Sequence, residues 1–284
     1  MIAFMKRNIK LYLRDKAGVG FSLLAVFIVI GLYVLFLGDV YANDLKHLEY
    51  GKEMMDAWVM AGVLAITSMT TTLGILGTVV RDKEQGLLKD FYVAPLRKWK
   101  IASGYLLSSY LVGVVMSLIA LVVAEIYIVS NGGDILSAQA MIKVLGMILL
   151  TSFMNTAIML FIVSFLKSMA AFSTVSTIIG TLIGFLTGIY LPIGMLLDPV
   201  KWVIKVFPVS HAAVVFRNIM MEDTMTKALE NAPTDIVLDV KESLGVVYFF
   251  GDKELGIGTS VIIVGVVGVV FLVAAIMKMK KQQK

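Results

Sequence analysis

The sequence predicts an all-α integral membrane protein with six transmembrane helices, built as a single domain over residues 1–284. The chain is 59% hydrophobic and only 16% charged, whereas a soluble domain carries about a quarter charged residues. Its mean hydropathy is +0.90. Its charges are also segregated between long apolar runs, and a helix needs about 20 apolar residues to cross a bilayer. These observations exclude a soluble enzyme, a nucleic-acid-binding domain and a disordered chain. The apolar runs are continuous rather than alternating, which excludes a membrane β-barrel.

Six stretches lack Asp, Glu, Lys and Arg, and each is long enough to cross the membrane. They predict spans at about 17–38, 57–80, 101–124, 144–166, 168–192 and 255–277. The fifth uncharged stretch continues to residue 197, which is longer than one crossing needs, so we expect Pro192 to end that helix. The remaining long connections are 81–100 and 193–254.

The positive charges predict the orientation of the chain. Successive connections between spans alternate between the two sides of the membrane. The connections on one side hold 16 Lys and Arg and four acids, and those on the other side hold nine Lys and Arg and 16 acids. Cytoplasmic loops of membrane proteins carry the excess of Lys and Arg. Both termini and the segment 81–100 are therefore expected in the cytoplasm, and 193–254 outside. The even number of spans agrees with this orientation.

Residues 1–16 predict an amphipathic helix lying in the inner membrane interface. The alternative is a solvated basic segment that leads into the first span. A cleaved secretory signal is disfavoured because the following apolar run of 22 residues exceeds the 7–15 of a signal core. The apolar residues that share one helical face are Ile2, Met5, Ile9, Tyr12 and Leu13.

The segment 81–100 predicts a second amphipathic helix on the cytoplasmic side. Asp82 and Glu84 suit a helix start, where the dipole favours acids, and Pro95 is expected to end the helix. Its apolar face would be formed by Leu87, Leu88, Phe91 and Tyr92. Such a helix can lie on lipid or dock a soluble partner, and periodicity does not choose between the two.

Two motifs in this order resemble those of type-2 ABC transporter permeases, the six-span membrane subunits of bacterial ATP-binding-cassette exporters. The first runs from Lys83 through Glu84, Gly86 and Leu87 to the Pro95 region, and it is similar to the family's E-x-G-(T/L) and P-(L/V)-(R/S) stretch. The second runs from Gly188 and Pro192 through the Phe207-Pro208 pair to Phe216-Arg217, and it resembles a family pattern that follows the fifth span. The resemblance covers essentially the whole chain, although 218–254 is longer than expected.

The resemblance implies a dimer of permeases, either a homodimer or a heterodimer, that works with two copies of a separate ATPase subunit. The cytoplasmic segment would be the coupling helix that contacts the ATPase. The chain has no G-x-x-x-x-G-K-(S/T) loop, so this chain is expected not to be an enzyme, and ATP and Mg²⁺ would be bound by the partner. The implied coupling residues are Glu84, Gly86, Leu87, Leu88, Phe91, Tyr92 and Pro95.

Spans two and five are rich in hydroxyl and small residues, and in such a dimer they would line the pathway or form the dimer seam. The alternative is ordinary close packing of helices, with the hydroxyls bonded to their own backbone. The residues are Thr67, Thr70, Thr71, Gly74, Ser173, Thr177, Gly180, Thr181, Gly184 and Gly188.

The outer segment is expected to return as short re-entrant helices, with turns at Pro192, Phe207 and Pro208, as the resemblance implies. Beyond them the pattern predicts two short amphipathic helices, 217–231 and 235–244, that cap the pathway. Glu125 and Lys143 are interpreted as an interfacial or mutual pair.

The predicted function is export of a hydrophobic or amphipathic substrate, such as an antimicrobial or cytolytic peptide, a drug or a lipid. The location is the plasma membrane of a bacterial cell. The uncharged lining and the 18 Met residues suit such cargo, although Met also fills ordinary packing gaps. The alternatives are a secondary transporter or channel that works without ATP, or a membrane-embedded immunity or scaffold protein. No metal site or cofactor is expected on this chain, and His211 is interpreted as a hydrogen-bonding residue.

Overall fold

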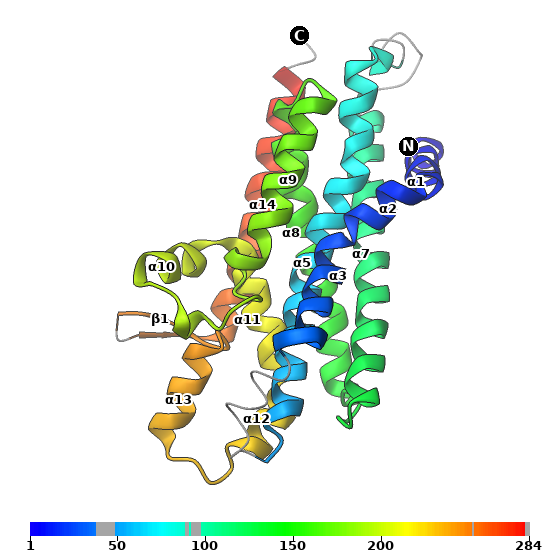
Figure 1. Ribbon diagram of the computed structural model, residues 1–284. Coiled ribbons are helices and arrows are strands. Elements are labelled where there is room, and N and C mark those ends of the chain that lie inside the picture. The colour runs from blue at the N-terminus through cyan, green and yellow to red at the C-terminus, as the bar shows by residue number, and fades with distance from the viewer. Residues whose placement is uncertain (38–48, 89–90, 92–97, 252, 282–284) are drawn as a thin grey trace.

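The computed structural model describes residues 1–37, 49–88, 91, 98–251 and 253–281 and shows a bundle of helices with one small hairpin (Figure 1). Five helices are long and apolar enough to cross a membrane. Two bent pairs of shorter helices raise the number to as many as seven if each pair is one crossing. The helical membrane fold is therefore confirmed, and the expected count of six lies within this range. The five helices are α5 (Gly51–Glu84), α7 (Lys98–Ser130), α8 (Ala138–Phe165), α9 (Met169–Leu186) and α14 (Ile257–Lys281).

The first predicted span is broken into short pieces. It consists of α2 (Lys16–Ser22), α3 (Leu24–Leu32) and the π-helical turn η1 (Tyr33–Leu37). The break falls where the hydroxyl of Ser22 lies 2.7 Å from that of Tyr12 and donates to the carbonyl of Val19 at 2.7 Å. These bonds fix the end of α2 against the preceding helix.

The N-terminal helix α1 (Ile2–Arg14) lies across the bundle rather than along it (Figure 1). Its polar Asn8 and aromatic Tyr12 are buried against other helices, and Leu13 is exposed. The helix predicted for residues 1–16 is present, and one of its faces packs on protein.

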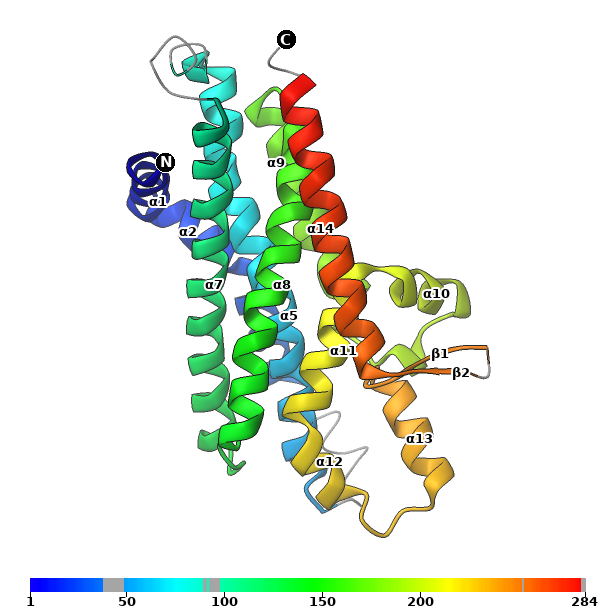
Figure 2. The ribbon, with the colours of Figure 1, turned by 180° about the vertical axis from the view of Figure 1, so that it is seen from behind.

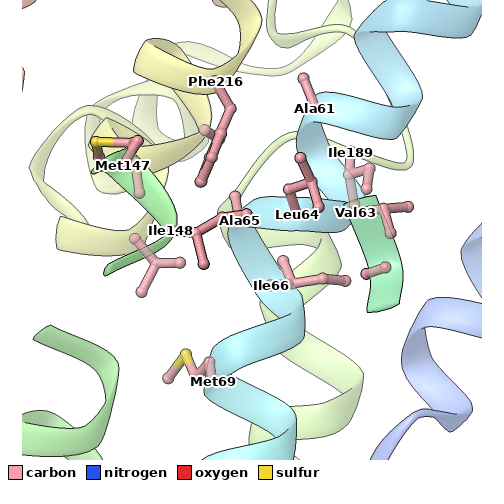
Figure 3. Packing of buried hydrophobic residues seen from close by; sticks show 14 of the residues in the cluster. Ala61, Val63, Leu64, Ala65, Ile66, Met69, Met147, Ile148, Ile189 and Phe216 are labelled. Atoms are coloured by element: carbon pink, nitrogen blue, oxygen red, sulfur yellow. The ribbon is translucent and has the colours of Figure 1, made fainter. Parts of the chain in front are cut away.

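Helix α5 forms the centre of the molecule and is covered on nearly all sides. It packs against α7, α8, α9, α11 and the N-terminal helices. Figure 3 shows Leu64 and Ala65 of α5 lying with Ile148 of α8 and Phe216 of α11. Both views show α8 and α14 side by side, with α7 next to α8 (Figures 1 and 2). The end of α5, the α8–α9 turn and the C-terminus lie at one end of the bundle (Figures 1 and 2).

Helix α9 ends at Leu186, earlier than predicted, so Pro192 does not end it. Gly188 turns the chain with a φ of +62°, a conformation that glycine adopts without strain. Pro192 instead precedes a single 3-10 turn, η2 (Ile193–Met195).

The chain then forms two helices bent by 86° at the Phe207-Pro208 pair, α10 (Asp198–Val206) and α11 (Pro208–Met220). Pro208 occupies the first turn of α11, where its missing N–H costs nothing. The prediction of a turn at these two residues is confirmed. Whether the pair is re-entrant stays a prediction.

The outer segment differs from the two helices predicted for it. Arg217 belongs to α11, and the expected helix over 217–231 is interrupted at Met221, where α12 (Glu222–Ala228) begins. The second helix is α13 (Thr234–Ser243). An antiparallel hairpin of β1 (Tyr248–Phe250) and β2 (Lys253–Leu255) follows, which the sequence patterns did not predict. Lys205 of α10 bonds both Glu242 and the carbonyl of Phe249, which ties these pieces together.

We expect Trp58→Phe to destabilise the protein, because the buried indole N–H donates to the carbonyl of Leu244 at 2.7 Å. Phenylalanine leaves that carbonyl without this donor, at a cost of about 1–3 kcal/mol. Thermal unfolding of the detergent-solubilised protein measures the effect. Trp202→Phe is the matched control, since Trp202 is 63% exposed and should unfold as wild type. Equal midpoints for both variants would contradict the assignment.

Candidate coupling segment and transport cavity

The coupling segment begins as the end of α5 rather than as a new helix. Asp82 and Glu84 lie in the last turn of α5, and the N–H of Gln85 still donates to the carbonyl of Arg81 at 2.9 Å. The prediction of a helix start at these acids was therefore wrong. Gly86, with a φ of +76°, turns the chain after the helix. Leu87, Leu88 and Phe91 follow in helical conformation, whereas Tyr92 and Pro95 lie outside the described residues.

An acid at a helix C-terminus is unfavourable unless it has a cationic partner, and Asp82 has one in α1. Arg7 donates to both oxygens of the Asp82 carboxylate, at 2.7 and 2.8 Å, and the hydroxyl of Tyr105 donates to it at 2.5 Å. The hydrogen bond with Asp82 raises the pKa of Arg7. This bidentate pair joins α1 to α5 and α7, and it explains how the N-terminal helix is held on the bundle.

Phe91 packs against α1, on Phe4 and on the Arg7 side chain that pairs with Asp82, instead of facing a partner protein. Its ring lies edge-on to Phe4 at 5.2 Å between centroids, and the guanidinium of Arg7 lies 5.1 Å from its centroid. Leu88 also packs against the buried core. Of the four apolar residues predicted for this face, Tyr92 lies outside the described residues, and among the other three Leu87 is the one not packed on the described core.

Two charged side chains at the end of α5 hold the turn between α8 and α9. The ammonium of Lys83 donates to the carbonyls of Ser164 and Leu166, both at 3.0 Å. The carboxylate of Glu84 accepts the backbone N–H of Met169, the first residue of α9, at 3.0 Å. We call Lys83 and Glu84 the α9 clasp, because Lys83 binds the α8–α9 turn and Glu84 binds the first residue of α9.

A cavity of about 990 Å³ lies between α9, α5 and the N-terminal helices. Six of the ten predicted pathway residues line it, and these residues come from two helices far apart in the sequence. They are Thr70 and Gly74 of α5 and Ser173, Thr177, Gly180 and Thr181 of α9.

The other four predicted pathway residues lie elsewhere. Thr67 and Thr71 are buried within α5, and their hydroxyls donate to the carbonyls of Val63 and Thr67. A methyl group on Gly184 would overlap the ring of Tyr190, and Gly188 is the turn that follows α9. The four-residue glycine spacing therefore does not form one continuous stripe.

Three of the hydroxyl residues of α9 that line the cavity are also exposed, on its open side. Ser173, Thr177 and Thr181 are exposed, and the two threonines donate to the carbonyl four residues earlier at 3.0 and 2.9 Å. This back-bonding lowers the cost of placing hydroxyls in an apolar setting. A methyl group on Gly180 would meet no atom of the described residues within 4 Å, so this face is open.

The structure excludes a mutual pair between Glu125 and Lys143 and agrees with the interpretation of His211. Glu125 and Lys143 are not paired with each other: Glu125 accepts the N–H of Leu136, and Lys143 lies 3.8 Å from Glu222. His211 is within hydrogen-bonding distance of the hydroxyl of Ser260, at 3.2 Å, as expected of a hydrogen-bonding residue.

Arg217, which ends the second motif, was not predicted as a site residue, and it is completely buried. It donates to the carbonyls of Thr187 and Gly188 at 3.1 and 2.9 Å, and its guanidinium lies 4.9 Å from the ring centroid of Trp58. It thus secures the turn after α9 against α5. The available signal was a lone cation within an otherwise uncharged stretch from residue 206 to 221.

We expect Glu84→Ala to loosen the first turn of α9 while Glu84→Gln preserves it. Alanine removes the acceptor for the N–H of Met169, and losing a side-chain cap costs about 0.5–2 kcal/mol, whereas the glutamine carbonyl still accepts. Hydrogen exchange at the first turn of α9 is the measurement. Glu254→Ala, in the exposed strand β2, should leave exchange unchanged. Identical exchange in the alanine and glutamine variants would show that the clasp does not hold α9.

The comparison with known proteins agrees with this architecture. A model of the ABC-2 family transporter proteins matches residues 42–277, from the chain before α5 into α14. No individually curated protein matches the chain. Permeases of this family are membrane transport subunits rather than ATPases, and they generally work with an ATPase subunit. The chain is thus a multi-pass membrane protein that belongs to the ABC-2 transporter permease family, as the two motifs predicted.

Proposed function

We propose that this chain is the permease of an ATP-driven exporter that moves a hydrophobic or amphipathic substrate out of a bacterial cell. The observation that carries the proposal is the α9 clasp. Lys83 and Glu84 lie next to the segment expected to meet an ATPase, and they bind the α8–α9 turn and the first residue of α9, respectively. Because α9 forms one wall of the cavity, a displacement of the coupling segment reaches the cavity through hydrogen bonds rather than through lipid. ATP and Mg²⁺ belong to the separate ATPase subunit.

The assembly consists of two permeases and two ATPase subunits, with both permease termini in the cytoplasm. The exposed hydroxyl face of α9 supports a seam between two copies. Ser173, Thr177 and Thr181 gain little from contact with lipid tails, whereas small and hydroxyl residues allow two helices to approach closely. The open face at Gly180 leaves space for that approach. The proposed pair is a homodimer.

The cavity walls support an amphipathic cargo such as a peptide, a drug or a lipid. One wall carries the hydroxyls of α9, and the facing wall carries Phe21, Ile28 and other apolar residues of α2 and α3. At one end, Arg81 lies 4.0 Å from Asp15, and both side chains are about half exposed. A molecule with separate polar and apolar sides fits this division better than a sugar or an inorganic ion does.

We expect Leu87→Asp to abolish recovery of the ATPase subunit and to abolish transport. A charge at an apolar anchor of an interface costs about 2 kcal/mol or more, which is roughly a 30-fold loss of affinity. Pull-down of the ATPase from membranes with equal permease expression measures it. Phe91→Ala is a poorer test, because Phe91 also packs on Phe4 and Arg7.

Leu238→Asp is the matched control, since this exposed residue of α13 lies at the opposite end of the bundle (Figure 1). It should recover the ATPase as wild type does. Full ATPase recovery together with full transport by Leu87→Asp would exclude the coupling segment as the docking site. Transport that continues without any ATPase would instead indicate a secondary transporter or channel.

We expect Thr177→Cys to form a disulfide-linked dimer in oxidised membranes. The chain has no cysteine, so a single introduced thiol reports only on its own surroundings. Val269→Cys is the control, because it is 54% exposed on α14, a helix that contributes no residue to the lining of the transport cavity. Gel electrophoresis should show a band at twice the mass for the first variant only. A cross-link to a different permease would replace the homodimer with a heterodimer, and equal cross-linking of both variants would remove the seam.

A further inference from the structure

A second cavity of about 950 Å³ lies on the outer side of the protein, apart from the transport cavity. It is enclosed by α8, α11, α12, α13 and the start of α14. Figure 2 shows α11 and α12 between α8 and α13, with α14 beginning next to the hairpin. Much of its wall is apolar and flexible, and the wall includes Met147, Leu150, Met221, Met225, Leu229 and Val261.

The cavity opens toward the face of α8 that is turned to the membrane. Gly146 lines the cavity, and it also lines a shallow apolar groove between α7 and α8. Ile142 and Leu149 are one turn away on the same helical face, with exposed fractions of 71% and 48%. In a membrane protein such exposed aliphatic side chains contact lipid tails. A chain from the bilayer can therefore enter past Gly146.

The walls carry more positive than negative charge. Three cations line the cavity, Arg217, Lys143 and Lys241, against the two acids Glu222 and Glu230. Lys143 is already 3.8 Å from Glu222, with both side chains partly exposed.

Arg217 is the unusual member of this set. Its hydrogen bonds within the described residues all go to backbone carbonyls, and its buried Nε has no hydrogen-bond partner among those residues. A buried cation without an opposing carboxylate is costly, and attraction to an anion in a low-dielectric cavity lowers that cost even without direct contact.

We propose that this cavity is a binding site for one anionic phospholipid. The phosphate lies within the field of Arg217, Lys143 and Lys241, and an acyl chain lies along the Met-lined wall and leaves past Gly146 into the bilayer. Net positive charge selects an acidic head over a zwitterionic one, and the apolar wall selects a chain over a free inorganic anion. The site is independent of the cargo and of the direction of transport, because it shares no lining residue with the transport cavity.

Trp58 is a suitable reporter of the site, because its ring stacks with Arg217, which lines the cavity. The chain has three tryptophans, so Trp99→Phe and Trp202→Phe together leave Trp58 alone. This single-tryptophan protein is reconstituted in phosphatidylcholine vesicles with increasing fractions of chain-brominated phosphatidylglycerol. Bromine quenches tryptophan emission only at short range. We expect saturable quenching at low fractions, and little quenching by brominated phosphatidylcholine at the same fractions.

Two sets of variants test whether the quenching lipid lies in this cavity. Gly146→Leu fills the entrance, where an added Cβ meets no atom of the described residues within 4 Å, and it should abolish the saturable quenching. Gly180→Leu, at an equally open glycine in the transport cavity, is the matched control and should leave quenching unchanged. Lys143→Gln and Lys241→Gln each remove one charge near the head and should weaken binding about fivefold.

Equal quenching by the two brominated lipids would overturn the proposal, because it would reflect the ordinary lipid shell. Quenching unaffected by both Gly146→Leu and the lysine variants would overturn it as well. If Gly146→Leu fails to insert, the lysine variants still decide the outcome. Quenching by a brominated free fatty acid, with none by phosphatidylglycerol, would reject the phospholipid.

Discussion

The burial of α5 is the constraint on which the rest of the structure depends. A helix of 34 residues that is covered on nearly all sides needs partners along its whole length, and no single helix supplies them. Helices α7 and α8 cover one part, α11 covers the outer part beside α8, and α9 with the N-terminal helices covers the part that faces the transport cavity. Lipid tails are as apolar as the side chains, so close packing rather than exclusion from water holds these contacts. Gly62 against Ile189 and Gly113 against Thr72 show how closely the neighbours approach.

Most polar side chains within the helices form hydrogen bonds with their own helix, and the few that do not connect distant parts of the chain. Most hydroxyls of α5 and α9 bond a carbonyl three or four residues earlier and impose no tertiary geometry. Asp82 and Arg217 cannot be satisfied in this way. The first needs Arg7 of α1, and the second needs the carbonyls of the turn after α9. These two residues therefore determine where the N-terminal helix and the outer segment lie.

The same logic explains how a movement at the proposed coupling segment can reach the cavity. The end of α5 carries Asp82, Lys83 and Glu84 in succession, and on a helix these three point in different directions. One binds α1, and the other two bind the C-terminal end of α8 and the start of α9. A movement at this end is thereby shared among the elements that surround the proposed pathway. This geometry, rather than the amphipathic pattern alone, supports a coupling role.

The sequence by itself determined the membrane fold, the approximate spans and the family. Long uncharged runs are required by the bilayer whatever the tertiary packing, and the two motifs are local. The sequence also predicted the turn at Phe207-Pro208, because the effect of proline on the backbone comes from its own ring and does not depend on distant residues.

The tertiary structure decided the remainder. Asp82 and Glu84 were predicted at a helix start but lie at the end of α5, where Arg7, 75 residues away in the sequence, stabilises Asp82. The chain turns after α9 at Gly188 rather than at Pro192. Arg217 is buried because the carbonyls of Thr187, Gly188 and Gly245 converge on its guanidinium. Periodicity reports which face of a helix is apolar, but it does not report which distant group will meet that face.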